Sequence, residues 1–202
     1  MQAQKKQVAI ASTKDSNRIN AFLGIFNTSF RELVAILDIQ SPLLIYKEEE
    51  DGLRAFYLVD EEQYSLIYKL VRTSSVKITH AGMYLGVLKS TDFIPSLHLG
   101  SLLARKKIAK NNLVWIDEHA SKLYTYGRDV FGCSITKKSQ GVFRENTWVL
   151  VMDNHDEFLG WGRLLVSLEN IEDQCEKPVI KNMLDIGMYL RCEENTCFPP
   201  EI

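Results

Sequence analysis

The chain has 202 residues, of which 46% are hydrophobic and 25% are charged. This hydrophobic share is enough to build a core and excludes a disordered chain, and the length allows one large domain or two small ones. The apolar runs are short, as at residues 148–152, and none reaches the ~20 residues of a membrane-spanning helix. The polar start, residues 1–7, lacks the apolar segment of a signal peptide. We therefore expect a cytoplasmic protein with no membrane partner, or a nuclear or nucleolar one in a eukaryote.

The net charge of −2 is unevenly distributed along the chain. Residues 1–112 carry 15 Lys and Arg against 11 Asp and Glu, a net of +4, whereas residues 113–202 carry 9 against 15, a net of −6. A partner rich in phosphate is therefore expected to bind the first part, or only a local patch of the second.

The first part predicts helices combined with antiparallel strands. Apolar residues recur at three- and four-residue steps from Ile19 to Leu37, which predicts one amphipathic helix from Asp15 or Ser16 to about Asp38. Two apolar runs around a charged turn then predict a β-hairpin. The elements expected after the first helix are this hairpin at residues 43–46 and 53–59, a helix following Asp60, strands at residues 76–79, 82–88 and 93–94, and a helix from Ser96.

A boundary between two domains is expected at Asn111-Asn112. The two asparagines have the chemistry of a turn, they follow the basic cluster of residues 105–110, and the charge balance changes sign there. This assigns residues 1–112 to an N-terminal α/β domain with an antiparallel sheet and residues 113–202 to a small closed β domain. The predicted fold class is therefore α+β.

The second part alternates apolar runs with tight turns. Gly127 is predicted to cap a helix in the left-handed conformation, and Gly160 and Gly162 are predicted to allow a bulge or curvature. The elements expected here are a strand at residues 113–116, a helix from Asp117 or Ser121 to Tyr126-Gly127, an extended segment at residues 128–135, strands at residues 148–152 and 158–165, a last strand at residues 179–186, and a closing helix at residues 187–191.

Sequence signatures of catalysis are largely missing. There is no HExxH, no GxSxG and no paired Cys–His spacing. His98 lies beside leucines on a predicted helix and is expected in the core, and Asp185 is expected to cap the helix that follows it. We predict no enzymatic activity, no metal and no cofactor. The four cysteines are expected to be reduced thiols and not a zinc site: Cys133, Cys175, Cys192 and Cys197.

Several motifs resemble those of a known family. Residues 126–131 (YGRDVF), 160–163 (GWGR) and 185–191 (DIGMYLR) resemble the PUA domain, a small pseudo-barrel RNA-binding module. Together with residues 82–86 (GMYLG) and the later segments at residues 96–99 (SLHL) and 114–116 (VWI), they resemble the Nip-seven family of ribosome-subunit biogenesis factors. The resemblance covers about residues 76–191.

This resemblance implies an α/β domain followed by a PUA-like β pseudo-barrel. It also implies a role in pre-ribosomal RNA processing and large-subunit assembly, with assembly proteins as partners and the RNA-degrading exosome as a further partner in archaeal members. We expect a monomer that binds single-stranded, U- or AU-rich RNA.

The family contacts RNA through basic residues on and just before the last strand. Lys177 and Lys181 match that placement. Arg163 and Arg128 are weaker candidates, and Arg191 is a further candidate for which a contact to the backbone is the alternative.

Other interpretations stay open at this point. Lys177 and Lys181 could be solvated surface charges, and the aromatic side chains of Tyr126, Trp161 and Tyr189 could stack on bases or lie in the core. The chain could also be a protein-interaction adaptor, or the accessory binding subunit of an RNA-modifying or RNA-degrading complex.

Overall fold

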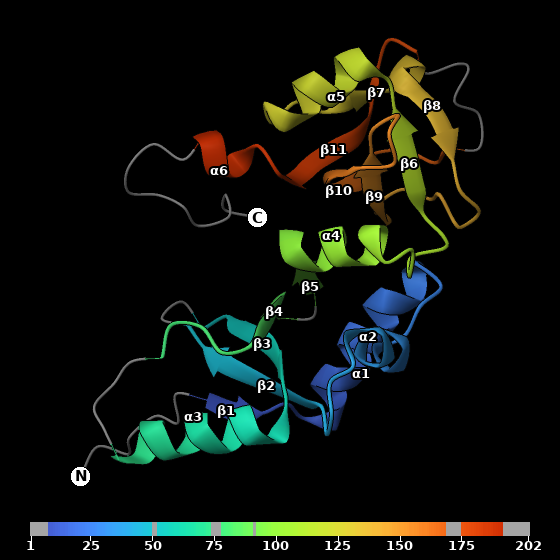
Figure 1. The fold of residues 1–202 in the computed structure, drawn as a ribbon. Helices are drawn as coiled ribbons and strands as arrows, with labels where there is room; N and C mark the ends of the chain where they lie inside the picture. The colour runs from blue at the N-terminus through green and yellow to red at the C-terminus, as the bar shows by residue number, and fades with distance from the viewer. Residues whose placement is uncertain (1–7, 50–51, 74–77, 91, 169–174, 192–202) are drawn as a thin grey trace. The chain divides into compact units, whose positions relative to one another are not determined.

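The computed structural model describes residues 8–49, 52–73, 78–90, 92–168 and 175–191. The chain forms two compact units, the first made of residues 1–24 and 29–99 and the second of residues 25–28 and 100–202 (Figure 1). The compact units therefore divide within helix α4 (Leu97–Arg105). The predicted domain limit at residue 112, which was based on turn chemistry, stays a prediction.

The first unit is built on a five-stranded antiparallel sheet in the order β1-β2-β3-β4-β5 (Figure 1). The predicted hairpin is confirmed as the β2–β3 pair. The elements that precede α4 are β1 (Val8–Ile10), α1 (Thr13–Ile25), α2 (Phe30–Leu37), β2 (Leu43–Glu48), β3 (Arg54–Val59), α3 (Glu61–Thr73), β4 (Met83–Lys89) and β5 (Asp92–Pro95).

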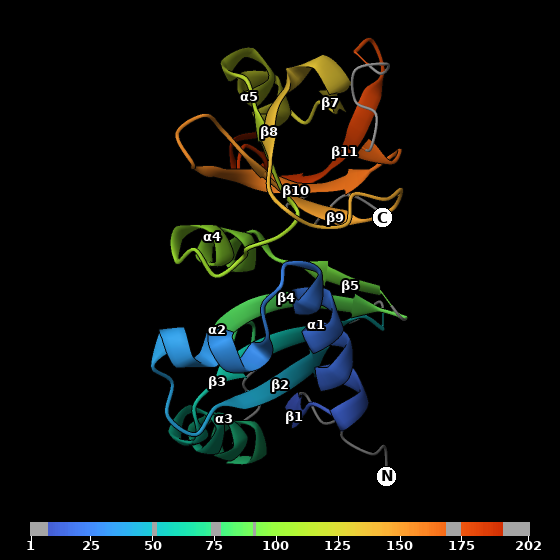
Figure 2. The same cartoon turned by 90° about the vertical axis from the view of Figure 1, so that its right-hand side faces the viewer.

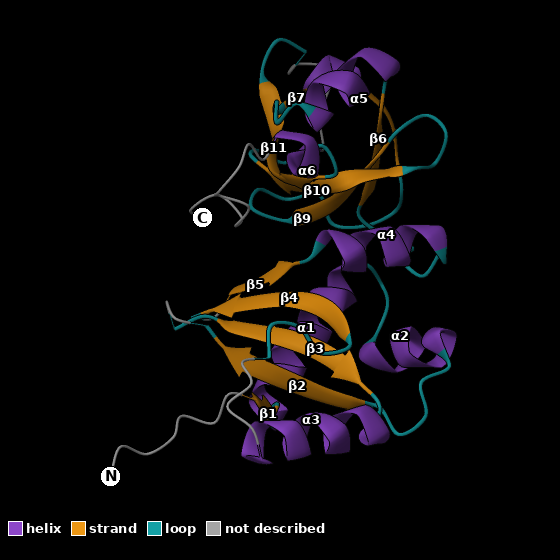
Figure 3. Ribbon diagram, turned by 60° about the vertical axis from the view of Figure 1, so that its left-hand side comes forward, coloured by secondary structure: helices purple, strands orange, loops and turns teal. Residues whose placement is uncertain are grey.

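The two faces of this sheet are covered by different helices, as Figure 3 shows. On one face, Tyr64 and Ile67 of α3 pack against a buried cluster that includes Ile45 and Tyr57. On the other face, Phe22 of α1 contacts Phe93 of β5 edge-on at 5.1 Å between ring centroids. The large apolar residues of α1 are mainly buried, whereas those of α3 that face the sheet are partly buried, and both helices pack on the sheet by an apolar face.

The single helix predicted from Asp15 to Asp38 is wrong, because the chain breaks into α1 and α2. Asn27 adopts the left-handed conformation (φ 54°). Ser29 then begins α2 with a capping box in which its hydroxyl accepts from the Glu32 amide and its own amide donates to the Glu32 carboxylate. The apolar spacing continues through the break, and the S-x-x-E signature was the local signal that marks it.

The second unit contains a six-stranded sheet in the order β7-β11-β10-β9-β6-β8. All neighbours are antiparallel except the parallel pair β6 and β9. The sheet curls on itself, with α5 lying across one open end (Figure 2). Its elements are β6 (Leu113–Ile116), α5 (Glu118–Thr125), β7 (Val130–Phe131), a 3-10 turn (Gly132–Ser134), β8 (Ile135–Lys138), β9 (Trp148–Met152), β10 (Phe158–Leu164), β11 (Pro178–Asp185) and α6 (Met188–Arg191).

The curled sheet encloses the core of the second unit. Fully buried Val149, Val151 and Ile180 pack together inside it, with Ala120 and Tyr124 of α5 closing the core. The predicted α+β class, with an antiparallel sheet first and a curled β domain second, is confirmed.

Trp161 of β10 packs on the outer side of this sheet and is completely buried. Phe26, Trp148 and Phe158 surround its indole at ring-centroid distances of 5.4, 6.3 and 5.9 Å. Gly100 is the first α4 residue that belongs to the second unit. A Cβ atom added to it would lie 2.3 Å from the Phe158 ring. The absence of a side chain at Gly100 therefore allows the helix to approach this aromatic cluster.

Three further sequence expectations differ from the structure. Residues 76–77 lie outside the described residues, and Ile78 and Thr79 form no strand. The extended segment expected at residues 128–135 is interrupted by the 3-10 turn after β7. His98 was expected in the core but is exposed, because α4 turns its leucines inward and not the histidine. No helix in the described ranges is long and apolar enough to cross a membrane.

A buried ion pair connects α1 to β3 in the first unit. Asp15 is 2% exposed, and Arg54 donates two hydrogen bonds to its carboxylate, at 2.7 and 3.0 Å. Ser12 donates a third at 2.7 Å. Burial raises the pKa of Asp15, but the hydrogen bonds from Ser12 and Arg54 and the charges of Arg54 and Arg18 outweigh it and leave the pKa below its usual value.

We predict that this carboxylate contributes to the acid sensitivity of the first unit. Because its pKa is lower in the folded than in the unfolded state, its stabilisation is complete above the unfolded value of about 4 and is lost as the pH falls through the folded value. The urea midpoint followed by circular dichroism should therefore fall on acidification below about pH 4. Asp15→Asn should lower the midpoint at pH 7 and flatten its decline in acid. Asp92→Asn, at the exposed first residue of β5, is the matched control. Equal pH profiles for Asp15→Asn and the wild type would contradict the assignment.

Candidate nucleic-acid interface

Two of the predicted basic residues lie side by side on neighbouring strands. Arg163 of β10 is the register partner of Lys181 of β11. Directly opposed residues of an antiparallel pair project from the same face of the sheet, so their cationic groups belong to one surface. Lys177 immediately precedes β11, and both lysines are exposed. In the described part of the chain neither lysine side chain takes part in an ion pair.

Arg163 is held in place by its own surroundings. Its Nε donates to the Asn146 carbonyl at 3.0 Å, and its guanidinium lies 5.6 Å from the centroid of the Trp148 ring. Trp148 is also the register partner of Arg163 on β9. A guanidinium placed on an aromatic face loses less conformational freedom when it binds a ligand. The structure thus orients Arg163, whereas Lys177 and Lys181 beside it extend as exposed cations.

Asn182, which the sequence reasoning overlooked, positions the segment that carries Arg128. Its side-chain amide donates to the Tyr124 carbonyl at 2.7 Å and to the Arg128 carbonyl at 3.5 Å. Its backbone amide donates to the Asp129 carboxylate at 2.8 Å. These bonds attach the end of α5 to the middle of β11. Asn182 is the one uncharged polar residue of the last strand (PVIKNMLD), and this was the signal that could have identified it.

The turn between α5 and β7 presents Arg128 to solvent. Gly127 has φ +84° and caps α5 as predicted, with its amide donating to the Tyr124 carbonyl at 2.9 Å. Arg128 itself is exposed, next to the exposed Asp129. The carboxylate of Asp129 reduces the positive potential here, so Arg128 is a weaker anion contact than Lys181.

The three candidate stacking residues separate into two groups. Trp161 is completely buried and belongs to the core. Tyr126, beside Gly127, is 71% exposed, and Tyr189 of α6 is 69% exposed. Exposed tyrosine rings are suited to stacking on unpaired bases. Tyr126 and Tyr189 therefore remain candidates, and Trp161 does not.

Arg191 is engaged in a structural ion pair. Its guanidinium donates two hydrogen bonds to the Asp185 carboxylate, at 2.9 and 2.7 Å, and another to the Thr125 carbonyl. Asp185 is 2% exposed and also accepts from the Gly187 amide at 2.9 Å, so it stabilises the turn into α6 as expected. The guanidinium that would meet RNA is thus used to neutralise a buried carboxylate, which favours the structural alternative for Arg191.

Besides Asp185, the described residues of the second unit include one further buried ionisable side chain, Tyr124. Its hydroxyl has no hydrogen-bond partner in the described part of the chain. Burial, followed by the negative charges of Asp185 and Asp129, raises the pKa of Tyr124 well above its usual value. The side chain therefore stays neutral and functions as part of the core.

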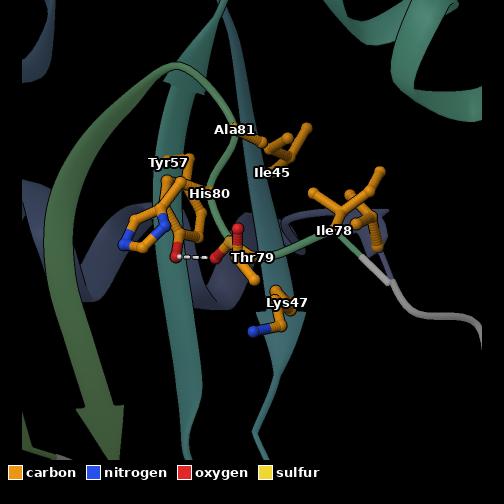
Figure 4. Close-up of a pocket in the computed structure, with 8 residues that line it drawn as sticks. Ile45, Lys47, Tyr57, Ile78, Thr79, His80 and Ala81 are labelled. Atoms are coloured by element: carbon orange, nitrogen blue, oxygen red, sulfur yellow. Dashed lines mark hydrogen bonds between the residues drawn. The ribbon is translucent and has the colours of Figure 1, made fainter. Parts of the chain in front are cut away.

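A crevice in the first unit is the alternative candidate site (Figure 4). Its lining is mostly apolar, with Ile45 and Ala81 buried. The Tyr57 hydroxyl donates to the Thr79 carbonyl at 3.5 Å, and Lys47 pairs with Glu49 at 3.0 Å. The Tyr57 hydroxyl and the Lys47 ammonium group thus already have partners within the protein.

No group of three or more His, Cys, Asp or Glu side chains within the described ranges is arranged to hold a metal ion. Cys192 and Cys197 lie outside those ranges. Cys133 and Cys175 are exposed and free.

Residues 112–194 match the model of the UPF0113 PUA domain. This part of the chain is thus similar to a PUA domain. It contains all five candidate RNA-binding residues named from the sequence, of which Lys177, Lys181 and Arg128 are exposed and Arg163 is partly exposed.

Relatives of known sequence and structure agree with this assignment. The UPF0113 protein of Archaeoglobus fulgidus is 38% identical over 81 residues, which are 40% of this chain and 45% of that protein. The UPF0113 protein of Aeropyrum pernix is 31% identical over 111 residues, 55% of this chain and 56% of that protein. The chain thus spans about half the length of these curated relatives.

The solved structure of a conserved PUA domain protein from Thermoplasma acidophilum is 16% identical, with a TM-score of 0.56. The match covers 86% of this chain and 90% of that one. At this identity the likeness concerns the fold alone, and it extends over both units of the chain.

We predict that Arg191 matters to the stability of the PUA domain. Arg191→Ala should lower the free energy of unfolding by about 2–3 kcal/mol, because it leaves the buried Asp185 carboxylate uncompensated. Urea unfolding followed by tryptophan fluorescence is the measurement, since Trp115, Trp148 and Trp161 all belong to this unit. Lys177→Ala is the control and should change the value by less than about 0.5 kcal/mol. If both variants are equally stable, Arg191 has no structural role.

Proposed function

We propose that this protein is a non-catalytic RNA-binding factor whose PUA domain contacts RNA through the surface around Lys177, Lys181 and Arg163. The observation that carries the proposal is the pairing of Arg163 with Lys181 across β10 and β11, with Lys177 exposed at the start of the same strand. A cluster of cations on a rigid sheet matches the spaced charges of a phosphate backbone.

Single-stranded RNA suits this surface better than a duplex. Exposed Tyr126 and Tyr189 offer aromatic faces to unstacked bases, and such bases are available in loops and single strands. Residues 113–202 have a net charge of −6, so binding depends on the local arrangement of a few cations. Such binding should weaken steeply as salt is added.

We place the protein in pre-ribosomal RNA processing and large-subunit assembly. This part of the proposal rests on the sequence resemblance to the Nip-seven family, in which an α/β domain precedes the PUA domain. The partners we propose are U- or AU-rich segments of precursor RNA, ribosome-assembly proteins and, in an archaeon, the exosome. We further propose that the protein acts as a monomer.

The absence of catalysis is part of the proposal. It is supported by the two buried carboxylates of the described residues, Asp15 and Asp185, each of which is neutralised by an arginine. A carboxylate that accepts bidentate hydrogen bonds from a guanidinium is a poor general base, because its charge is already compensated.

A protein-interaction adaptor is the second candidate, favoured by the surface of α3. Leu66, Tyr68 and Leu70 on this helix are 60%, 45% and 43% exposed. Exposed large apolar side chains gathered on one helix are typical of protein contacts. A partner that remains bound after nuclease treatment in a pull-down would favour this function over RNA-mediated association.

We predict that Lys177→Ala combined with Lys181→Ala weakens binding of a single-stranded U-rich RNA. Two lost phosphate contacts should flatten the plot of log K against log salt by about 1.4 units. Fluorescence anisotropy titrations at several salt concentrations provide the measurement.

The matched control removes two exposed lysines of the first unit, Lys14→Ala with Lys69→Ala, which changes the net charge equally. It should leave the salt dependence almost unchanged. Equal loss in both variants would mean that overall charge, and not this surface, binds RNA. Unchanged affinity of the Lys177 and Lys181 variant would remove both residues from the site.

The cellular role is tested by crosslinking in cells followed by sequencing of the bound RNA. We expect enrichment of precursor ribosomal RNA for the wild type and its loss for the Lys177 and Lys181 variant, because the same contacts hold the RNA. Enrichment of other RNA classes alone would overturn the assignment to ribosome assembly while leaving RNA binding intact.

A further inference from the structure

Two exposed cysteines that are 42 residues apart in the sequence meet at the open end of the β7–β11 pair. Cys133 lies in the 3-10 turn after β7, and Cys175 lies shortly before β11. The Cys133 thiol donates to the Cys175 backbone carbonyl at 2.8 Å, so the Cys133 sulfur lies against the backbone of Cys175. Both are free thiols in the structure.

The backbone on either side fixes this proximity. Pro178 is the register partner of Phe131, and the Gly132 amide donates to the Lys177 carbonyl at 3.2 Å. The two segments are therefore antiparallel neighbours up to the cysteines. Because the Cys133 sulfur already contacts the Cys175 backbone, side-chain rotation is the movement that would bring the two sulfurs together.

We infer that Cys133 and Cys175 form a reversible disulfide when the protein meets a small-molecule disulfide such as oxidised glutathione. The Cys133 thiolate attacks one sulfur of the oxidant, forms a mixed disulfide and releases one glutathione thiolate. The Cys175 thiolate then attacks the Cys133 sulfur and releases the second glutathione thiolate. The two protein thiols lose their protons to the released thiolates, so two thiols are oxidised and one glutathione disulfide is reduced to two glutathione molecules.

The interaction with the neighbouring Cys133 raises the pKa of the Cys175 thiol. Both thiols are exposed to the oxidant, and the steps balance equally with Cys175 as the first nucleophile.

A Cys133–Cys175 disulfide would link the β7 edge of the sheet covalently to the segment before β11, where backbone pairing is short. Strand β7 has only two residues, and its register with β11 is irregular between Pro178 and Ile180. A disulfide that closes a loop of this length removes conformational freedom mainly from the unfolded chain. Oxidation should therefore stabilise the PUA domain without rebuilding it, and this expectation does not depend on RNA binding.

The experiment uses the full-length chain, reduced and then incubated under native conditions in mixtures of reduced and oxidised glutathione. Remaining thiols are alkylated after an acid quench, and intact mass and peptide mapping identify the bonds. The variant Cys192→Ser with Cys197→Ser retains only the proposed pair and serves as the matched control. Urea-unfolded protein in the same mixtures reports the pairing expected without the fold.

We expect native wild type and the Cys192→Ser, Cys197→Ser variant to lose the mass of two hydrogen atoms and to yield one peptide that joins Cys133 to Cys175. We expect the oxidised form to melt roughly 5–10 °C above the reduced form. Cys133→Ser should abolish both effects. Linkage of either cysteine to Cys192 or Cys197, persistent glutathione adducts, or thiols that stay free in mixtures that oxidise the unfolded chain would each overturn the inference.

Discussion

The packing of Trp161 is the interaction on which the rest of the second unit depends. Its indole is completely buried among three other aromatic rings, at the middle of the central strand β10. Both flanking residues are glycines, and an added Cβ would lie 2.3 Å from the Leu184 carbonyl at Gly160 and 2.3 Å from the Ile180 side chain at Gly162. Register shifts occur at these same positions in the pairing with β9 and with β11. Bulges bend and twist a strand, so this short motif both curls the sheet and places Arg163 opposite Lys181.

The distribution of charge follows a second constraint, which is that buried carboxylates require partners. Asp15 and Asp185 are each 2% exposed, and each receives a bidentate guanidinium, from Arg54 and Arg191 respectively. Arginine suits this task because its planar fork satisfies both carboxylate oxygens at once. Arg54 and Arg191 are thus used within the fold, whereas Lys177 and Lys181 remain exposed at β11. This division explains how an acidic domain can still present a local cationic surface.

The same strand, β11, connects the proposed functional features. Asn182 attaches it to the end of α5, Lys181 faces Arg163 of β10, and its entry lies beside Cys133 and Cys175. A covalent bond at that entry would act on the edge of the sheet that is held by the fewest backbone contacts. Stability and the presentation of Lys177 are therefore physically coupled, because Lys177 lies between Cys175 and the strand.

Sequence alone determined the α+β class, the hairpin and most strands, since these depend on local periodicity and turn chemistry. It also located the glycine cap at Gly127 and the lysines near the last strand. Tertiary structure decided what periodicity does not encode. The apolar spacing of residues 19–37 is the same for one helix as for two, and only the Ser29 cap and left-handed Asn27 divide it. Trp161 and Tyr189 are both aromatic in the sequence, yet one is core and the other is 69% exposed. In the sequence Arg191 is one of several basic candidates, and only the structure shows that it pairs with the buried Asp185. Burial and long-range pairing depend on which segments meet in space, and that information lies in the packing of the whole chain.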